Sequence, residues 1–435
     1  MEEMKKNVDI LVKFFTKQSQ YAVPGVSVSV PADASNEVLN EIIKTYICQG
    51  SKIKAENVPT FDFIVEGQIL RRVLDLHLQK LGISFENVIK IEYFERLPPP
   101  TPKDSLMHDD WVSSVHCSQD WLLTGCYDNT LHLWDVKKLG GTKISQAHKL
   151  TIPAHNAPVK AVTWVDSESD IKTFISTSID QAAYVWTWDS KANSVECVSR
   201  GCGHTQSVEC VAVDQLKSLF VTGSWDTRLK IWALDDKKPD TNDQRDNEEE
   251  GETKKKKSQG NKIHKMTPLL TMAGHSENVG GVVWTDVSEI ASASWDHTVR
   301  IWDTDIGGIK SQIVGNCAFF SISWSPLNKT LITGCADNFI RLYDPRSSEG
   351  TVCQQKFASH TKWVPSVMWS ATNQFTFVSG GFDNTVKQWD SRSPKAPLYD
   401  LVGHKRKVLT VDWSYSKYII SGSEDCTVKA YTAKV

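Results

Sequence analysis

The chain has 435 residues and a formal net charge of −3 at pH 7. This length predicts two to four domains, and the near-neutral charge argues against a protein that coats nucleic acid by bulk electrostatics. The absence of an apolar run of about 18 residues argues against a membrane span, and no secretory signal is expected. Ten cysteines without a Cys-x-x-Cys pair favour a reduced intracellular compartment.

Tryptophan divides the chain into two parts, because none of the 16 Trp residues lies before Trp111. We therefore expect a Trp-free module over 1–97 and a Trp-rich domain over 108–435. Between them, residues 98–107 contain Pro98-Pro99-Pro100-Thr101-Pro102, which predicts a stiff, extended connector.

The N-terminal module shows both strand and helix periodicity. The pattern predicts strands near 8–15, 26–30, 61–65, 68–70 and 88–94, and helices over 35–47 and 74–81. The resulting order, ββαββ(α)β, resembles the ubiquitin-like β-grasp fold, an α+β domain. The module runs on into Pro98 without a free Gly-Gly tail, which favours a built-in docking domain over a conjugated modifier.

The remainder of the chain contains a sevenfold repeat. In each repeat an Asp is followed six residues later by Trp or Tyr, and a Ser or Thr lies four residues before the Asp. The pairs are Asp128/Trp134, Asp180/Trp186, Asp226/Trp232, Asp296/Trp302, Asp337/Tyr343, Asp383/Trp389 and Asp425/Tyr431. Six repeats also have a His 20–25 residues before the Asp, whereas the fifth has Gly315-Asn316 there.

These residues resemble the WD40 repeat family, with a Gly-His or Ala-His near the start of a repeat and Trp-Asp at the end of three of them. The resemblance implies an all-β, seven-bladed WD40 propeller of four-stranded sheets over 108–435. Only four residues follow Tyr431, so we expect a strand from about 100–107 to complete the last sheet.

The recurring polar residues are expected to be structural. In the clearest repeat, His275 would bridge Ser292 and Asp296, and the indole of Trp302 would complete the set. The alternative, a hydrolase triad, requires a nucleophile once rather than seven times, and no Gly-x-Ser-x-Gly motif accompanies the sets. We therefore expect no enzyme.

Four segments narrow the family. Residues 61–67, 91–93, 108–115 and 396–401 are similar to the ribosome-biogenesis WD-repeat proteins that carry an NLE domain. The resemblance implies a non-enzymatic factor of the nucleolus and nucleoplasm that acts on the pre-60S particle in maturation of 28S and 5.8S rRNA. Its implied partners are the propeller of the block-of-proliferation protein, pescadillo, and the AAA ATPase midasin.

The same resemblance implies a role for one loop residue. Glu86, flanked by Ser84 and Phe85, would give a carboxylate oxygen to the Mg²⁺ ion of midasin's MIDAS domain, so this chain would hold no metal or cofactor of its own. Mg²⁺ prefers octahedral oxygen ligands and keeps exchangeable water, which such a carboxylate can replace.

Three alternatives stay open. The charged insertion 235–266 is either a nuclear-import or rRNA-contact segment or a tolerated, disordered loop. The basic run Lys405-Arg406-Lys407 either contacts rRNA or is solvated. The segment Trp389-Asp390-Ser391-Arg392 matches the W-D-x-R motif of cullin-4 ubiquitin-ligase substrate receptors, in which Arg392 would contact the adaptor.

Overall fold

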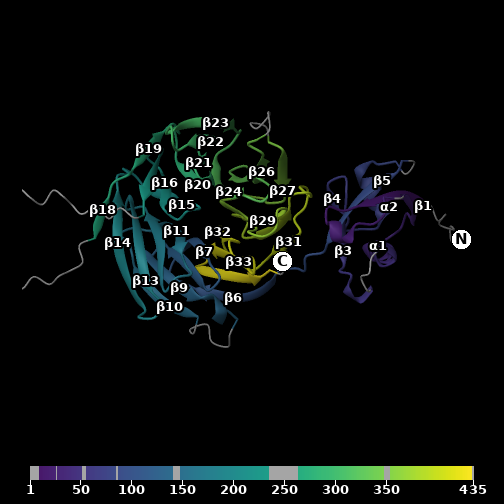
Figure 1. Cartoon of the computed structure of the whole chain (residues 1–435), viewed down its shortest axis with the longest axis horizontal. Helices are drawn as coiled ribbons and strands as arrows, with labels where there is room; N and C mark the ends of the chain where they lie inside the picture. Colours follow the sequence, from purple (N-terminus) through teal and green to yellow (C-terminus); the bar gives the residue numbers. More distant parts are fainter. Residues whose placement is uncertain are drawn as a thin grey trace, which may run out of the picture.

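The computed structural model describes residues 9–25, 27–50, 55–84, 87–140, 147–234, 263–346 and 353–433. Figure 1 shows two units, a small N-terminal unit and a ring of β-sheets. Helices are few in the described residues, and none of them has the length and apolar character needed to cross a membrane.

The N-terminal unit is a five-stranded mixed sheet in the order β2-β1-β5-β3-β4, packed with two helices. β1 pairs antiparallel with β2 and parallel with β5. Ile10, Val12 and Phe14 of β1 are buried, and the residues between them are exposed, so one face of the sheet covers the core. The elements are β1 (Asp9–Phe15), β2 (Ser27–Pro31), α1 (Asn36–Gly50), β3 (Phe61–Val65), β4 (Gln68–Ile69), α2 (Leu74–Leu81) and β5 (Ile89–Glu95).

The second unit is WD40 propeller-like and contains seven antiparallel-based sheets of four or five strands among the described residues. In chain order the first four sheets contain β7 (Val112–Cys117), β8 (Trp121–Cys126), β9 (Thr130–Asp135) and β10 (His148–Pro153); β11 (Val159–Asp166), β12 (Ile171–Ser178), β13 (Ala182–Asp189), β14 (Ser194–Cys202) and β18 (His264–Met266); β15 (Val208–Val213), β16 (Leu219–Ser224), β17 (Arg228–Ala233) and β19 (Leu270–Ala273); β20 (Val279–Asp286), β21 (Glu289–Ser294), β22 (Thr298–Asp303) and β23 (Gly308–Val314).

The last three sheets contain β24 (Phe319–Ser325), β25 (Thr330–Cys335), β26 (Phe339–Tyr343) and β27 (Gln355–Ala358); β28 (Ser366–Trp369), β29 (Thr376–Gly380), β30 (Val386–Asp390) and β31 (Tyr399–Leu401); β32 (Val408–Asp412), β33 (Tyr418–Ser423), β34 (Thr427–Thr432) and β6 (Thr101–Met107).

The ring closes on itself. The first strands of successive sheets contact one another in turn, and β32 of the last sheet contacts β7 of the first. β6, which precedes the first repeat, pairs antiparallel with β34 and so covers the outer edge of the last sheet. A strand that precedes the first repeat is therefore joined to the last repeat in one sheet.

A tight turn of the same shape recurs in every sheet of the ring. The residue after each repeat Asp has a positive φ, for example His297 at 67°. The strain of this backbone conformation is offset by the preceding Asp, because Asp296 Oδ1 accepts the backbone N–H of Thr298 at 2.9 Å. The turn residues are Asn129, Gln181, Thr227, His297, Asn338, Asn384 and Cys426.

The charged insertion is shorter than 235–266. Residues 235–262 lie outside the described residues, but His264–Met266 form β18, which pairs parallel with β14. The buried side chain of Met266 packs in a cluster with Phe220 and Trp232, which gives this end of the segment a place in the fold.

Candidate functional site

The loop between α2 and β5 is the site expected to bind a partner's metal ion. α2 ends at Leu81 and is capped by Gly82, whose φ of 69° suits glycine and whose N–H donates to the carbonyls of Leu78 and Gln79. Ile83 donates its N–H to Leu78 and packs against the core of the unit. Ser84 is described, whereas Phe85 and Glu86 lie outside the described residues. α2 thus fixes one end of this loop, and β5 fixes the other.

The clearest polar set of the ring is a closed hydrogen-bond chain. His275 Nδ1 lies 2.8 Å from Asp296 Oδ2, and His275 Nε2 lies 2.7 Å from Ser292 Oγ. The indole N–H of Trp302 donates to the same Ser292 Oγ at 2.8 Å. Burial alone would raise the pKa of Asp296, but hydrogen bonds from His275 and Thr298 outweigh it and hold that pKa well below its usual range.

Four other repeats hold the same His–Asp and His–Ser/Thr bonds. These sets are His155/Ser176/Asp180, His204/Thr222/Asp226, His360/Ser379/Asp383 and His404/Ser421/Asp425. Ser292 is fully buried, and the equivalent hydroxyls are also buried. A substrate cannot reach a nucleophile placed in this way, so the geometry supports a structural role for the sets.

The first repeat departs from the expected set. His108 Nε2 lies 2.8 Å from Thr124 Oγ1, but its buried Nδ1 has no partner within the described chain. Asp128 accepts hydrogen bonds from the N–H and hydroxyl of Thr130, as Asp296 does from Thr298, but the bond to the His is missing. The ring of His132 occupies the space beside His108, at 4.7 Å between centroids. Repeat spacing alone could not reveal this neighbour, since His132 lies outside the recurring positions.

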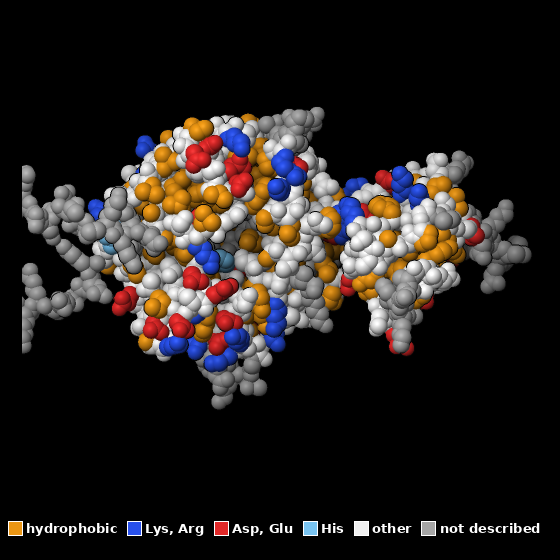
Figure 2. All heavy atoms as spheres, viewed as in Figure 1, with side chains coloured by type: hydrophobic (Ala, Val, Ile, Leu, Met, Phe, Trp, Pro, Cys, Tyr) orange, Lys and Arg blue, Asp and Glu red, His pale blue; other side chains and the backbone are white. Residues whose placement is uncertain are grey.

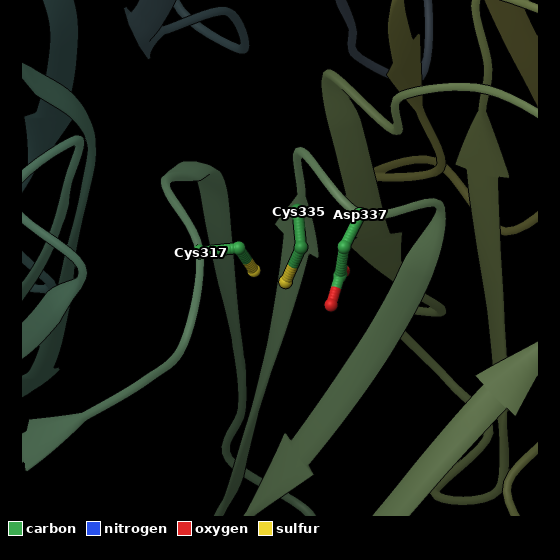
Figure 3. A group of neighbouring side chains, drawn as sticks. All are labelled: Cys317, Cys335 and Asp337. Carbon is green, nitrogen blue, oxygen red and sulfur yellow. The ribbon is translucent and has the colours of Figure 1, made fainter.

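The fifth repeat replaces its missing His with a different cluster, shown in Figure 3. Donor atoms of Cys317, Cys335 and Asp337 lie within 4.8 Å of one another, close enough to suggest metal ligands. However, Arg341 Nη1 donates to Asp337 at 2.8 Å and contacts Cys317 Sγ at 3.4 Å. A guanidinium therefore already supplies the positive charge that a cation would bring, and the cluster resembles a substitute for the His–Asp bond.

This arrangement also shifts the pKa values of the two thiols in opposite directions. A hydrogen bond from Cys335, with the charge of Arg341, lowers the pKa of Cys317, whereas burial raises the pKa of Cys335. The missing His at Gly315-Asn316 is apparent from the sequence, whereas the contacts of Arg341 that take its place are apparent only from the structure.

Arg392, which the alternative interpretation offers to an adaptor, lies between the two units. Its guanidinium is 4.1 Å from the ring centroid of Phe94 and 4.4 Å from that of Phe375. It also makes two bonds to Asp390 and one to Glu92 Oε1 at 3.0 Å. Only 12% of its side chain is exposed, so this Arg is used within the chain.

Further hydrogen bonds join the units. Arg71 Nη2 donates to the carbonyl of Leu398 at 2.9 Å and also to that of Pro397. The hydroxyl of Tyr399 donates to the carbonyl of Leu97 at 2.6 Å. With the Arg392 contacts, these bonds attach the N-terminal unit to the sheet of β28–β31, beyond the covalent connector.

Comparisons with known proteins agree with this two-unit architecture. Residues 10–78 match the NLE (NUC135) domain. The WD domain, G-beta repeat, matches 101–135, 195–233, 266–303, 310–344, 351–390 and 395–432. Residues 136–194, which contain β11, β12 and β13, are absent from these matches, although their sheet and the His155 set are present.

Similarity extends over nearly the whole chain. The "Ribosome biogenesis protein WDR12 homolog" of Ixodes scapularis is 45% identical over 432 residues, covering 99% of this chain and 100% of the relative. The protein of the same name from Aedes aegypti is 44% identical over 436 residues, covering 99% and 97%. None of these matches indicates an enzyme family. The chain therefore belongs to the family of ribosome biogenesis WDR12 homologues, which carry an NLE domain and WD repeats.

Proposed function

We propose that this protein is a non-catalytic factor in assembly of the large (60S) ribosomal subunit, required for maturation of 28S and 5.8S rRNA. The observation that supports it most strongly is similarity over 99% of the chain to relatives named ribosome biogenesis proteins. The buried Ser and His side chains of the repeat sets fit a scaffold rather than an enzyme. Its expected location is the nucleolus and nucleoplasm, on pre-60S particles.

The architecture suggests a division of labour. The ring would be a seven-bladed propeller that holds the propeller of the block-of-proliferation protein, which is joined to pescadillo. The N-terminal unit would be a ubiquitin-like β-grasp domain offered to midasin. The seven sheets in contact around the ring and the mixed sheet of the N-terminal unit support these assignments.

Glu86 would make the contact with midasin dependent on metal. Its carboxylate would replace a water molecule on the Mg²⁺ ion of the MIDAS domain, and that ion belongs to the partner. Gly82 and Ile83 anchor the loop on one side, and β5 anchors it on the other. Force that midasin applies to this unit would pass to the ring through the connector and the Arg392 and Arg71 contacts.

The test is binding of the full chain to the isolated MIDAS domain of midasin. Glu86→Gln should abolish binding in Mg²⁺, and chelation by EDTA should abolish binding of the native chain. Glu41→Gln is a matched control on the same unit, because the Glu41 side chain is 78% exposed on α1. Binding by Glu86→Gln at native affinity, or undiminished binding in EDTA, would exclude the metal-bridged contact.

No observation favours the cullin-4 substrate receptor. That role needs Arg392 to reach an adaptor, but the side chain is enclosed between Phe94 and Phe375 and paired with Glu92. An adaptor would first have to separate the two units.

A further inference from the structure

A basic cleft of about 470 Å³ lies between the two units. One wall comes from β4, α2 and the residues that join them, and the other from residues 393–396 of the ring. Its charged lining residues are all cationic: Arg71, Arg72, Lys80 and Lys395. Figure 2 shows Lys and Arg side chains on the N-terminal unit near its junction with the ring.

Three of these cations have no counter-ion. Arg71 is occupied by the carbonyls of Pro397 and Leu398 and holds the walls together. Arg72, Lys80 and Lys395 are exposed, and within the described residues none of them forms an ion pair or a side-chain hydrogen bond. Three unpaired positive charges gathered within one small cleft repel one another and favour a ligand that carries several negative charges.

The neighbouring histidine, His77, is uncharged. His77 lies buried on α2 in the cleft wall, and its Nε2 has no partner among the described residues. Burial, together with the charge of Lys80, lowers the pKa of His77, so it is neutral at physiological pH. Because no Asp or Glu lines the cleft, its positive potential comes from the Arg and Lys side chains and is not offset by any lining group.

We propose that this cleft binds the phosphate backbone of single-stranded RNA, with Arg72, Lys80 and Lys395 each neutralising one phosphate. No Phe, Tyr or Trp side chain lines the cleft and the His77 ring is buried in its wall, so bases would not stack there and binding would be independent of sequence. RNA is the polyanion that a ribosome biogenesis factor meets. The inference rests on that proposed role but not on Glu86 or midasin, which take no part in the test below.

The experiment measures fluorescence anisotropy of labelled oligouridine of about 20 nucleotides with the full chain, at about 50 mM and about 200 mM KCl. Three phosphate contacts on a single strand predict a loss of affinity of about 20-fold between these salt concentrations. The variant Arg72→Gln/Lys80→Gln/Lys395→Gln should bind more weakly and should lose this part of the salt dependence.

A matched variant controls for overall charge. Arg228→Gln/Lys356→Gln/Lys362→Gln removes two Lys and one Arg that are exposed on the ring, away from the cleft lining and from the basic run 405–407, and should bind RNA like the native chain. Three outcomes would overturn the proposal: no RNA binding by the native chain, equal loss in both variants, or tighter cleft-dependent binding of labelled polyglutamate than of RNA. The last would make an acidic protein segment the occupant. Far-UV circular dichroism verifies that each variant is folded.

Discussion

Arg392 of the ring and Glu92 of the N-terminal unit form an ion pair of 3.0 Å in which only 12% and 11% of the two side chains are exposed. Asp390, with 1% of its side chain exposed, binds the other side of the guanidinium. One Arg thus neutralises a carboxylate from each unit, while Phe94 and Phe375 cover its faces. The N-terminal unit is therefore docked on the ring as well as tethered to it.

Arg392→Ala should release this docking. It leaves Asp390 and Glu92 buried without their shared cation. We expect this to lower the stability of the docked arrangement by about 3–5 kcal/mol. The connector around Pro98 should then become sensitive to limited proteolysis, and small-angle scattering should show a larger radius of gyration.

Arg346→Ala is the matched control for this change. Arg346 holds the equivalent position in the preceding repeat and binds Asp344 in the same way, but 57% of its side chain is exposed. A native digestion pattern is expected for this variant. If Arg392→Ala also gave a native pattern and radius, the two units would be held together by other contacts.

Asp296→Ala should destabilise the ring without affecting any exposed surface. It removes the acceptor of His275 and of the Thr298 N–H, and unpaired buried donors cost about 1–3 kcal/mol each. The melting temperature measured by calorimetry should fall, whereas Asp305→Ala, at an exposed position two residues after Asp303, should leave it unchanged. Equal melting temperatures for the two variants would show that the hydrogen-bond chain contributes little.

Contacts between residues close together in the chain could be predicted from the sequence, whereas contacts between distant residues could not. The Asp–Trp spacing predicted the hydrogen-bonded set around His275 because all its members recur at fixed offsets. It was wrong for Asp128, because His108 Nδ1 has no partner among the described residues and the ring of His132, at a position that does not recur, lies beside it. The role of Arg392 between the units could not be predicted, since its partner Glu92 lies 300 residues away and no local pattern encodes that contact.

The same limit applies to the rest of the site. The periodicity of apolar residues predicted the five strands and two α-helices of the N-terminal unit to within a few residues, but not the short 3-10 helices Ser19–Tyr21 and Ala55–Asn57. The basic cleft was not foreseen, because Lys80 and Lys395 belong to different units and meet only through docking. Glu86 stays a prediction, as it lies outside the described residues.

Two neighbours on β6 can test how the ring is closed. Leu106 is fully buried in a cluster with Ile420 and Val428, whereas 65% of Met107 is exposed. Leu106→Ala should lower the free energy of unfolding by about 2–5 kcal/mol, and Met107→Ala should change it little. Urea titration monitored by Trp fluorescence measures both. If Leu106→Ala were neutral, pairing of β6 with β34 would not be needed to hold the last sheet.

Buried histidines should make the protein less stable in mild acid. Burial, with the charge of His132, lowers the pKa of His108 to about 3, and burial lowers that of His132 to about 4. In the unfolded chain both titrate near 6.5. Below that pH the unfolded state takes up protons that the folded state does not, so stability is full above about pH 6.5 and declines as the pH falls toward 4.

The urea midpoint should therefore decrease between about pH 7 and pH 5, with each of these two histidines contributing up to about 2 kcal/mol. Aspartates such as Asp296, whose pKa is lowered, contribute only below about pH 4 and do not explain a change in this window. His108→Gln/His132→Gln should show a shallower decrease. His297→Asn, at an exposed turn position that Asn tolerates, should retain the native slope. Parallel pH profiles for the double variant and the native chain would show that these two rings accept protons without unfolding.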